Sequence, residues 1–331
     1  MRLTIRRFSL FTLLLSTCLV LAAVTGCKAN GDEAHSKPSI TTSAEGLAPN
    51  TSEDVPAPQT TGGFDGKRSF AHVAKQVGFG PRPSGSPAIE KLQEYIQSEL
   101  TSYGCTLETD AFTADTPVGR LPMKNILVKI PGDKPEVILL GTHYDTLRMA
   151  DFVGANDAGS STAVMLELAR LLCPQHGRRA VWIAFFDGEE AMKSWSEMDS
   201  RYGSREMAAR FANSGDISKI KAFLLADIVG GHPLHFRRDS TSTKALVDVV
   251  WDTAAKLVYA DIFLNESQSV EDDHDPFLKR KVPSVDVIDL DREHDVPYWH
   301  TPQDTLDKIS AKSLAITGHV FLESVKKLQA N

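Results

Sequence analysis

Three apolar runs that end in ionisable residues limit the folds open to this chain more than any other feature. The segments VILLGTHYD (137–145), AVWIAFFDGEE (180–190) and KAFLLADIVGG (221–231) are rich in large apolar residues, and each runs into an acid or a histidine. Such runs are typical of buried strands in a parallel sheet. A fourth run, VPSVDVIDLD (282–291), has the same character.

Segments with helical spacing separate these runs or follow them. SSTAVMLELARLLC (160–173) repeats apolar residues at the helical period, and further helices are predicted around 243–258 and 310–328. The alternation predicts an α/β fold, a three-layer α/β/α sandwich with a mostly parallel central sheet. Hydrophobic residues make up 42% of the chain, enough for one sizeable core, which we place in a catalytic domain at residues 64–331.

The first 26 residues have the three parts of an export signal. Three arginines precede a short apolar stretch, and small residues lead to Cys27. The stretch is short for a hydrocarbon core of ~30 Å. Val24-Thr25-Gly26-Cys27 resembles the lipobox of bacterial lipoproteins, which implies cleavage before Cys27 and lipidation of that cysteine. The alternative is an ordinary signal peptide with a chance cysteine. We expect an exported bacterial lipoprotein at the periplasmic face or cell envelope.

Residues 27–63 are predicted to form a disordered tether. They are rich in Ser, Thr, Pro, Ala and Gly and contain almost no large apolar residue, so they cannot bury a core. A flexible chain of this length reaches roughly 30 Å. We therefore expect membrane contact only through the lipid anchor. We also expect the protein to be a monomer.

Charge and cysteine content narrow the possible partners. The chain has 36 basic and 43 acidic residues, and removing the leader takes away three arginines and no acid. This acidic balance argues against nucleic acid as a partner. Cys105 and Cys173 are the cysteines left once Cys18 is removed and Cys27 is lipidated. They could pair in an oxidising compartment, but two cysteines define no disulfide framework.

Candidate site residues lie where the predicted strands end. In open α/β sheets, ligands bind outside the carboxyl ends of the strands, and the residues at those ends are His143, Asp145, Glu189, Glu190 and Asp227. His143 and Asp145 are two residues apart and can share a face of the strand end. Glu189 and Glu190 are adjacent and diverge, so one can bind a metal while the other acts as a general base or acid.

Two loop residues complete a candidate metal site. Asp157 lies in the Gly- and Ala-rich turn GANDAGSSTA, and His300 lies in VPYWHTPQDT ahead of the last predicted helix. Asp157 could instead serve as a helix cap, and His300 taken alone is more often structural than a ligand. Together with Glu190 they supply two oxygens and one nitrogen, a set that suits zinc with an open fourth position.

In this order, the blocks HYD, ANDAGSS, DGEE, a downstream Asp and a late His resemble the zinc-dependent aminopeptidase superfamily over roughly residues 65–329. The resemblance implies its fold and a zinc centre. It matches five residues to the ligands of a two-zinc peptidase, with Glu189 as the base. Those five residues are His143, Asp157, Glu190, Asp227 and His300.

Three further stretches resemble the glutaminyl cyclases of that superfamily. They are FFDGEEAMKSWSEMDSRYGSREMA, EDDHDPFLKRKVPS and the WHT around Trp299. The segment RPSGSP (82–87) also resembles the cyclases, near their N-terminal helix. This resemblance implies one zinc per chain, held by Asp157, Glu190 and His300, with Glu189 as the proton shuttle. It also implies a short acidic hydrogen-bond network of Asp227 and Asp272, and a substrate pocket shaped by Trp195, Trp299 and Glu271.

The sequence departs from the animal cyclases at two places. Asp286 stands where they have a second active-site histidine, which leaves its part in the network open. The disulfide that flanks their metal loop is absent, because Thr142 and the region of Ser161 occupy the positions of its cysteines.

The cyclase resemblance implies a glutaminyl-peptide cyclotransferase, an acyltransferase that converts the N-terminal glutamine of peptides or proteins to pyroglutamate and releases ammonia. A secreted two-zinc aminopeptidase is the main alternative, because every ligand type it needs is present. A catalytically silent binding lipoprotein is a third hypothesis, and it predicts no bound metal. Metal stoichiometry and the released product separate the three.

Overall fold

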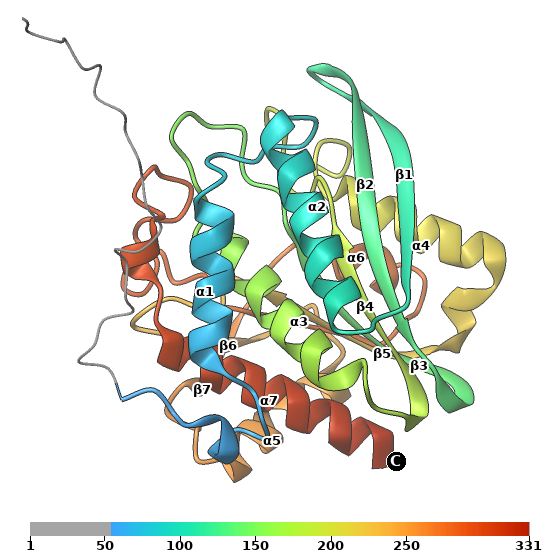
Figure 1. Cartoon of the computed structure of the whole chain (residues 1–331), viewed down its shortest axis with the longest axis vertical. Coiled ribbons are helices and arrows are strands. Elements are labelled where there is room, and N and C mark those ends of the chain that lie inside the picture. Colours follow the sequence, from blue (N-terminus) through green and yellow to red (C-terminus); the bar gives the residue numbers. More distant parts are fainter. Residues whose placement is uncertain (1–53, 331) are drawn as a thin grey trace, which may run out of the picture. The chain divides into compact units, whose positions relative to one another are not determined.

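The computed structural model describes residues 54–330. The predicted leader, Cys27 and most of the predicted tether lie outside this range. Within it, the central sheet has six strands in the order β1-β2-β4-β3-β5-β8 (Figure 1). Their bounds are β1 Leu107–Thr116, β2 Gly119–Ile130, β3 Gly132–His143, β4 Gly177–Phe186, β5 Ile220–Asp227 and β8 Ser284–Ile288.

The strands predicted from the apolar runs form the parallel part of the sheet. β4, β3, β5 and β8 are neighbours and pair in parallel. β2 pairs antiparallel with both β1 and β4, so it alone among the six runs against the others. The predicted mostly parallel sheet is confirmed, and the carboxyl ends of the four parallel strands meet at one edge.

Side chains that alternate along the strands face two hydrophobic layers. In β3, Ile138 and Leu140 belong to one core, and Val137 and Leu139 belong to the other. Five helices cover the first face and two cover the second (Figure 1). The first group is α1 (Gly66–Val77), α2 (Pro87–Ser102), α3 (Gly159–Leu172), α5 (Lys244–Lys256) and α7 (Ala311–Ala330), and the second is α4 (Tyr202–Ser214) and α6 (Asp275–Leu278).

Helices α1 and α2 each begin after a residue whose side chain caps the first turn. The Asp65 carboxylate accepts hydrogen bonds from two amides in the first turn of α1, and the Ser86 hydroxyl accepts one from the amide of Ile89 in α2. Pro87 occupies the first position of α2, where its missing N–H costs nothing. Apolar side chains of α2, among them Ile89 and Leu92, then pack in the first hydrophobic layer.

Residues 54–63 correct the predicted tether boundary, because they pack on the domain. They include the short helix η1 (Pro58–Thr60), and the Thr61 hydroxyl, which is buried, donates to the Phe64 carbonyl at 2.6 Å. The Gly63 carbonyl accepts a hydrogen bond from Arg170 Nη2 at 2.9 Å. Composition alone suggested a linker here, whereas backbone hydrogen bonds hold the segment in place.

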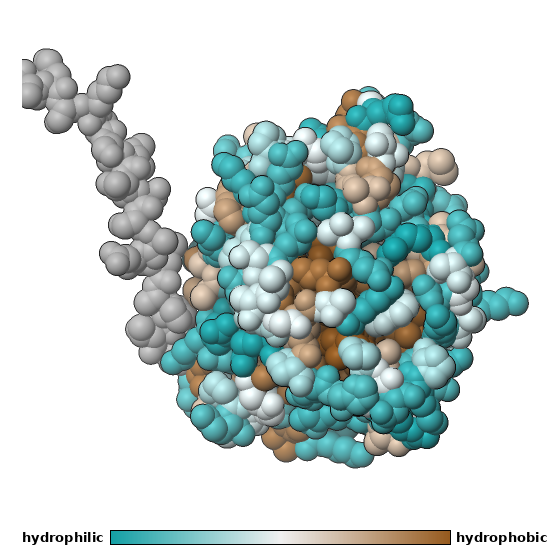
Figure 2. All heavy atoms as spheres, turned by 45° about the vertical axis from the view of Figure 1, so that its right-hand side comes forward, coloured by the Kyte–Doolittle hydropathy of each residue, from teal (hydrophilic) through white to brown (hydrophobic). Residues whose placement is uncertain are grey.

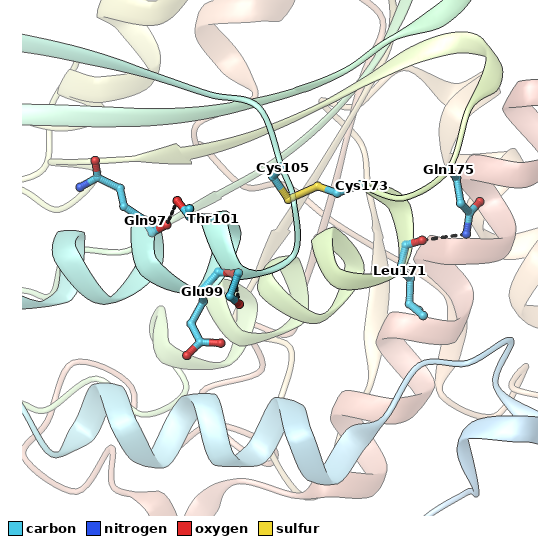
Figure 3. Close-up of a disulfide and its surroundings, with 8 residues drawn as sticks. Gln97, Glu99, Thr101, Cys105, Leu171, Cys173 and Gln175 are labelled. Atoms are coloured by element: carbon cyan, nitrogen blue, oxygen red, sulfur yellow. Dashed lines mark hydrogen bonds between the residues drawn. A yellow bond between two sulfur atoms is a disulfide. The ribbon is translucent and has the colours of Figure 1, made fainter.

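A disulfide joins Cys105 and Cys173, a pairing that the sequence left open (Figure 3). Cys105 lies between α2 and β1, and Cys173 caps the end of α3. The bridge closes a chain segment that spans β1, β2, β3 and the loop of Asp157.

Smaller elements complete the described part of the domain. A second sheet pairs β6 (Phe236–Asp239) with β7 (Phe263–Gln268), and two further short helices are η2 (Asp216–Lys219) and η3 (Leu306–Lys308). The face in Figure 2 is mostly hydrophilic, with a small group of hydrophobic residues near its centre. No helix within residues 54–330 combines the length and apolar character that crossing a membrane requires.

Candidate active site

The carboxyl ends of three parallel strands bring the predicted ionisable residues together. β3 ends at His143, β4 leads into Glu189 and Glu190, and β5 ends at Asp227. All four side chains are buried, with at most 6% of each residue exposed. Buried ionisable groups are costly unless they are paired or bind an ion.

Two clusters of metal-ligand type share the carboxylate of Asp157. Asp157 Oδ1 lies 3.2 Å from His143 Nε2, and Asp157 Oδ2 lies 3.3 Å from His300 Nε2. Asp227 Oδ1 is 3.1 Å from His143 Nε2, and Glu190 Oε1 is 3.2 Å from His300 Nε2. Within each cluster, ligand atoms of the three residues lie within 4.8 Å of one another. The structure therefore brings together the three residues predicted to bind zinc.

The cluster of Asp157, Glu190 and His300 fits a metal ion by its own chemistry. Although Glu190 Oε1 lies near His300, neither oxygen of this buried carboxylate has an aligned hydrogen-bond donor within residues 54–330. Two carboxylates and an imidazole are ligands that zinc commonly takes in catalytic sites. A cation between them would satisfy oxygens that otherwise lack a partner.

The protonation of this cluster also indicates a cation site. Burial on its own would lower the pKa of His300, but the carboxylates of Asp157 and Glu190 raise it to about 10. Burial and the charge of Asp157 raise the pKa of Glu190 to about 7. Burial opposes ionisation of Asp157 too, yet its contacts with His143 and His300 hold its pKa below the usual range. The protons that His300 and Glu190 retain are the ones that a bound divalent cation would displace.

Asp145 supports the site in two ways. Its Oδ1 lies 3.4 Å from His143 Nδ1, so the two residues do lie on one side of the strand end, as their spacing allowed. Its two oxygens also accept hydrogen bonds from the amides of Glu189 and Glu190, at 3.0 and 3.3 Å. One carboxylate thus fixes the backbone of the glutamate pair after β4 and offers a negative charge to the histidine at the end of β3.

Glu189 lines the cavity and has an environment suited to proton transfer. Burial raises the pKa of its carboxyl well above the usual value, His143 opposes this, and Asp272 and Glu190 add to it. A carboxyl with a raised pKa can accept and donate a proton near neutral pH.

The acids predicted as a hydrogen-bond network are close together but are not hydrogen-bonded to one another. Burial, together with Asp227 and Asp273, raises the pKa of Asp272 well above its usual value. Burial and the charge of Asp272 do the same for Asp286. Within residues 54–330, neither carboxylate oxygen of Asp286 has a hydrogen-bond partner, and Asp227 Oδ1 accepts from the amide of Ile228 and contacts His143. The three acids therefore interact through charge.

A cavity of about 610 Å³ opens beside the clusters. Its lining includes Glu189, Glu271 and both tryptophans predicted to shape a substrate pocket. The indole of Trp299 stacks on the His300 imidazole with ring centroids 3.7 Å apart. Trp195 is 41% exposed, and its Nε1 donates to Glu271 Oε2 at 3.2 Å. The remaining lining residues are Leu147, Asp157, Glu190, Ala191, Lys193, Asp227, Ile228, Ser269, Val270, Asp272, Ile288, Leu290, Arg292 and His300.

The comparisons with known proteins agree with this geometry. Peptidase family M28 matches residues 125–325. A solved glutaminyl cyclase from an Acidobacteriales bacterium is 42% identical, with a TM-score of 0.77 over 81% of this chain and 95% of that one. The glutaminyl-peptide cyclotransferase of Boiga irregularis is 30% identical, over 73% of this chain and 76% of that protein. The chain belongs to the glutaminyl-peptide cyclotransferases of peptidase family M28.

The same fold also carries peptidases. A Zn-dependent exopeptidase from Parabacteroides distasonis is 26% identical, with a TM-score of 0.73 over 78% of this chain and 97% of that one. The cyclotransferase and peptidase members of the family therefore share the framework, and their difference must lie in details of the site.

Three positioning residues of this family member were not singled out from the sequence. The Asp304 carboxylate accepts hydrogen bonds from the amides of Asn156 and Asp157, at 2.8 and 3.0 Å. The fully buried Arg82 guanidinium donates to the carbonyls of Val153 and Gly154, at 2.8 and 3.2 Å. Both hold the loop of Asp157. The motifs that contain them, RPSGSP and WHTPQDT, were recognised, but a motif does not identify a partner far along the chain.

Asp199 is the third such residue, and it organises the loop that carries Trp195. Its two carboxylate oxygens accept hydrogen bonds from the amides of Met192, Lys193 and Ser194 and from the Tyr202 hydroxyl, at 2.8 to 3.0 Å. The DSRYGS stretch of the cyclase resemblance thus has a structural meaning, because its first residue closes the loop.

A hydrogen bond occupies the position of the missing animal disulfide. The Thr142 hydroxyl donates to the Ser161 hydroxyl at 2.8 Å, and both side chains are buried. It joins the end of β3 to the start of α3, on either side of the Asp157 loop.

Proposed function

We propose that this chain is a zinc-dependent glutaminyl-peptide cyclotransferase. The observation that carries the proposal is the convergence of Asp157, Glu190 and His300 beside a cavity lined by Glu189 and two tryptophans. Membership of the cyclotransferase family supports it. The substrates are peptides or proteins with an N-terminal glutamine, and one zinc is held per chain.

The reaction is an intramolecular acyl transfer. The α-amine of the terminal glutamine attacks its own side-chain amide carbon, the new C–N bond closes a five-membered lactam, and the former amide nitrogen leaves as ammonia. Asp157, Glu190 and His300 would hold the zinc, which would supply Lewis-acid chemistry to the amide. Glu189 accepts the proton from the attacking amine and delivers it to the departing nitrogen, so no net proton is consumed.

Other residues of the cavity orient the substrate and the proton shuttle. Asp272, Glu190 and Asp273 surround Glu189 and add to the effect of burial on the pKa of its carboxyl, which helps Glu189 retain a proton between its two transfers. Trp195 and Trp299 offer apolar surfaces that exclude water and hold the glutamine side chain folded onto its own amine.

A two-zinc aminopeptidase is the second candidate, and one specific observation favours it. His143, Asp157 and Asp227 form a further cluster of metal-ligand type. It shares Asp157 with the cluster that contains Glu190 and His300. Two adjacent metals could activate a water for peptide hydrolysis. The identity to glutaminyl cyclases weighs against this alternative.

One experiment separates the two functions. The purified protein is incubated with a Gln-initiated peptide and with a matched Leu-initiated peptide, with and without a chelator, and zinc is counted per chain. One zinc, ammonia release from the Gln peptide alone and loss of activity with the chelator are expected. Two zincs with release of free amino acids would select the peptidase.

We propose further that the protein is an exported monomeric lipoprotein anchored through Cys27. The leader composition and the lipobox resemblance support this, and a disulfide between Cys105 and Cys173 is consistent with an oxidising compartment. Metabolic labelling with a fatty acid is expected to mark the wild-type chain and to miss Cys27→Ala. Labelling of both chains would contradict the anchor.

A further inference from the structure

The mouth of the cavity carries two cations without an acidic partner. Lys193 and Arg292 both line the cavity and are exposed to solvent. Within residues 54–330, no carboxylate lies within 4.0 Å of either charged group, whereas the nearby Arg201 and Lys279 pair with Asp275 and Glu197. The cavity interior is strongly acidic, so these two positive charges at its edge need an explanation.

Other contacts hold the Arg292 guanidinium and the backbone of Lys193 in place. The Arg292 guanidinium lies over the indole of Trp299, with Cζ 4.0 Å from the ring centroid. The amide of Lys193 donates to Asp199 Oδ2 at 2.9 Å, which fixes the loop from which its side chain extends. The two residues therefore come from separate anchored loops, one after β4 and one after β8.

The one exposed acid of the cavity lining is already engaged. Glu271 Oε2 accepts a hydrogen bond from Trp195 Nε1 and lies 3.8 Å from Arg201 Nη2. Its charge is thus partly offset by Arg201. Lys193 and Arg292 remain available for a carboxylate that comes with the substrate.

We propose that Lys193 and Arg292 select peptides with an acidic residue directly after the N-terminal glutamine. The inference rests on the proposed function. A glutamine whose side chain reaches Asp157, Glu190 and His300 occupies the interior, so the second residue of the peptide lies at the mouth beside the two cations. A Glu or Asp side chain there gains two favourable contacts, and a Lys side chain is repelled.

The expected preference follows from the strength of partly exposed ion pairs. Such pairs contribute modestly because water and salt screen them, so two of them correspond to a preference of about five- to tenfold in kcat/KM. The preference is electrostatic, and we expect it to weaken as ionic strength rises.

The test compares three peptides that differ only at the second position: Gln-Glu, Gln-Gln and Gln-Lys at the start of one common sequence. The ratio of kcat/KM values is measured for the wild type, for Lys193→Gln with Arg292→Gln, and for Lys91→Gln with Lys312→Gln. The last pair removes the same charge from exposed positions outside the cavity lining. We expect the Gln-Glu preference in the wild type and in this control, and its loss in the first pair.

A variant with reversed charge tests the proposal even if the neutral variants lose activity. Lys193→Glu with Arg292→Glu is expected to favour the Gln-Lys peptide. The proposal would be overturned by equal kcat/KM values for the three peptides in the wild type. It would also be overturned by an acidic preference that survives in Lys193→Gln with Arg292→Gln. In both outcomes the cyclotransferase activity itself is present. No ammonia from any of the three peptides would instead overturn the proposed function.

Discussion

Replacing Asp199 by asparagine is expected to release the loop that carries Trp195. In the wild type, Asp199 Oδ2 accepts hydrogen bonds from the amides of Lys193 and Ser194, at 2.9 and 3.0 Å. Asparagine has the same shape but presents an NH2 group in place of one oxygen. The side-chain amide can turn so that its NH2 group lies at the Oδ1 position, where it faces the amide of Met192, another donor. The negative charge that strengthens the bonds from Lys193 and Ser194 is also gone.

The magnitude follows from these contacts. A hydrogen bond to a charged group contributes about 1.5–3 kcal/mol, and one between neutral groups about 1 kcal/mol. Losing the bond from Met192 and weakening those from Lys193 and Ser194 therefore weakens closure of the loop by about 3 kcal/mol or more. That free energy corresponds to roughly a hundredfold increase in the population of the open loop. The rest of the domain does not depend on these bonds, and we expect global unfolding to change much less than local opening.

Limited proteolysis measures the opening directly. Trypsin cleaves after Lys193 when the loop opens, and this cleavage is expected to accelerate about a hundredfold in Asp199→Asn if opening and closing are fast. Ser196→Ala is the matched control in the same loop, because it removes only the neutral acceptor of the Asp199 amide. A loss of about 1 kcal/mol there gives an increase of about fivefold. We also expect KM to rise more than kcat falls.

The pH dependence has a definite sign. Burial opposes ionisation of Asp199, but hydrogen bonds from the amides of Ser194 and Met192 outweigh it and lower the pKa of its carboxyl. The resulting stability is fully present above the ordinary carboxyl pKa of about 3.9 and is lost as pH falls through the lower folded value. The ratio of cleavage rates should therefore be constant between about pH 6 and 8. Equal cleavage of the variant and the wild type would refute this account of the loop.

Three further predictions concern single sites. Glu189→Gln is expected to retain zinc and lose about 10²–10⁴-fold in kcat, and full activity would remove Glu189 from proton transfer. Serine at both Cys105 and Cys173 should lower the free energy of unfolding by about 4 kcal/mol, since the bridge spans 68 residues, with a lower Tm and unchanged activity at ~25 °C. Val258 follows α5 with a φ of 61° and 84% exposure. Val258→Gly should therefore raise Tm by about 1–3 °C, whereas Val118→Gly, outside the left-handed region, should lower it.

The sequence predicted the sheet and the ionisable residues at its edge because both depend on local patterns. A strand buried on both faces is apolar throughout, so the point at which acids first appear marks its end. His143, Glu190 and Asp227 could be placed at one edge from this rule alone. Asp157 and His300 lie in loops, so no strand end places them. Their residue types suggested a zinc site with Glu190, and the family resemblance then assigned the three to one zinc.

The supporting contacts could not be predicted because they join residues far apart in the chain. Asp304 reaches the amide of Asp157 across a separation of 147 residues, and no periodicity relates the two. A buried arginine such as Arg82 is also invisible to composition, since its partners are backbone carbonyls that every residue carries. The packing of residues 54–63 was missed for the same reason, as hydrogen bonds to the backbone leave no mark on side-chain content.

The acids around Asp272 show a different limit. Their proximity followed from the resemblance, but direct hydrogen bonds between them require one carboxyl to turn toward another. In the structure, Asp227 is directed to His143 and to its own backbone, and Asp286 is left without a partner among the described residues. Orientation of this kind depends on every neighbour at once.

The shared carboxylate of Asp157 makes the residues of the site unequal targets for evolution. A change at Asp157 damages both clusters, whereas a change at His143 alters only one and a change at His300 only the other. A lineage could thus change the ligands around His143 step by step without altering Glu190 or His300. A common ancestor of hydrolytic and cyclising members would have needed no new scaffold to give rise to both.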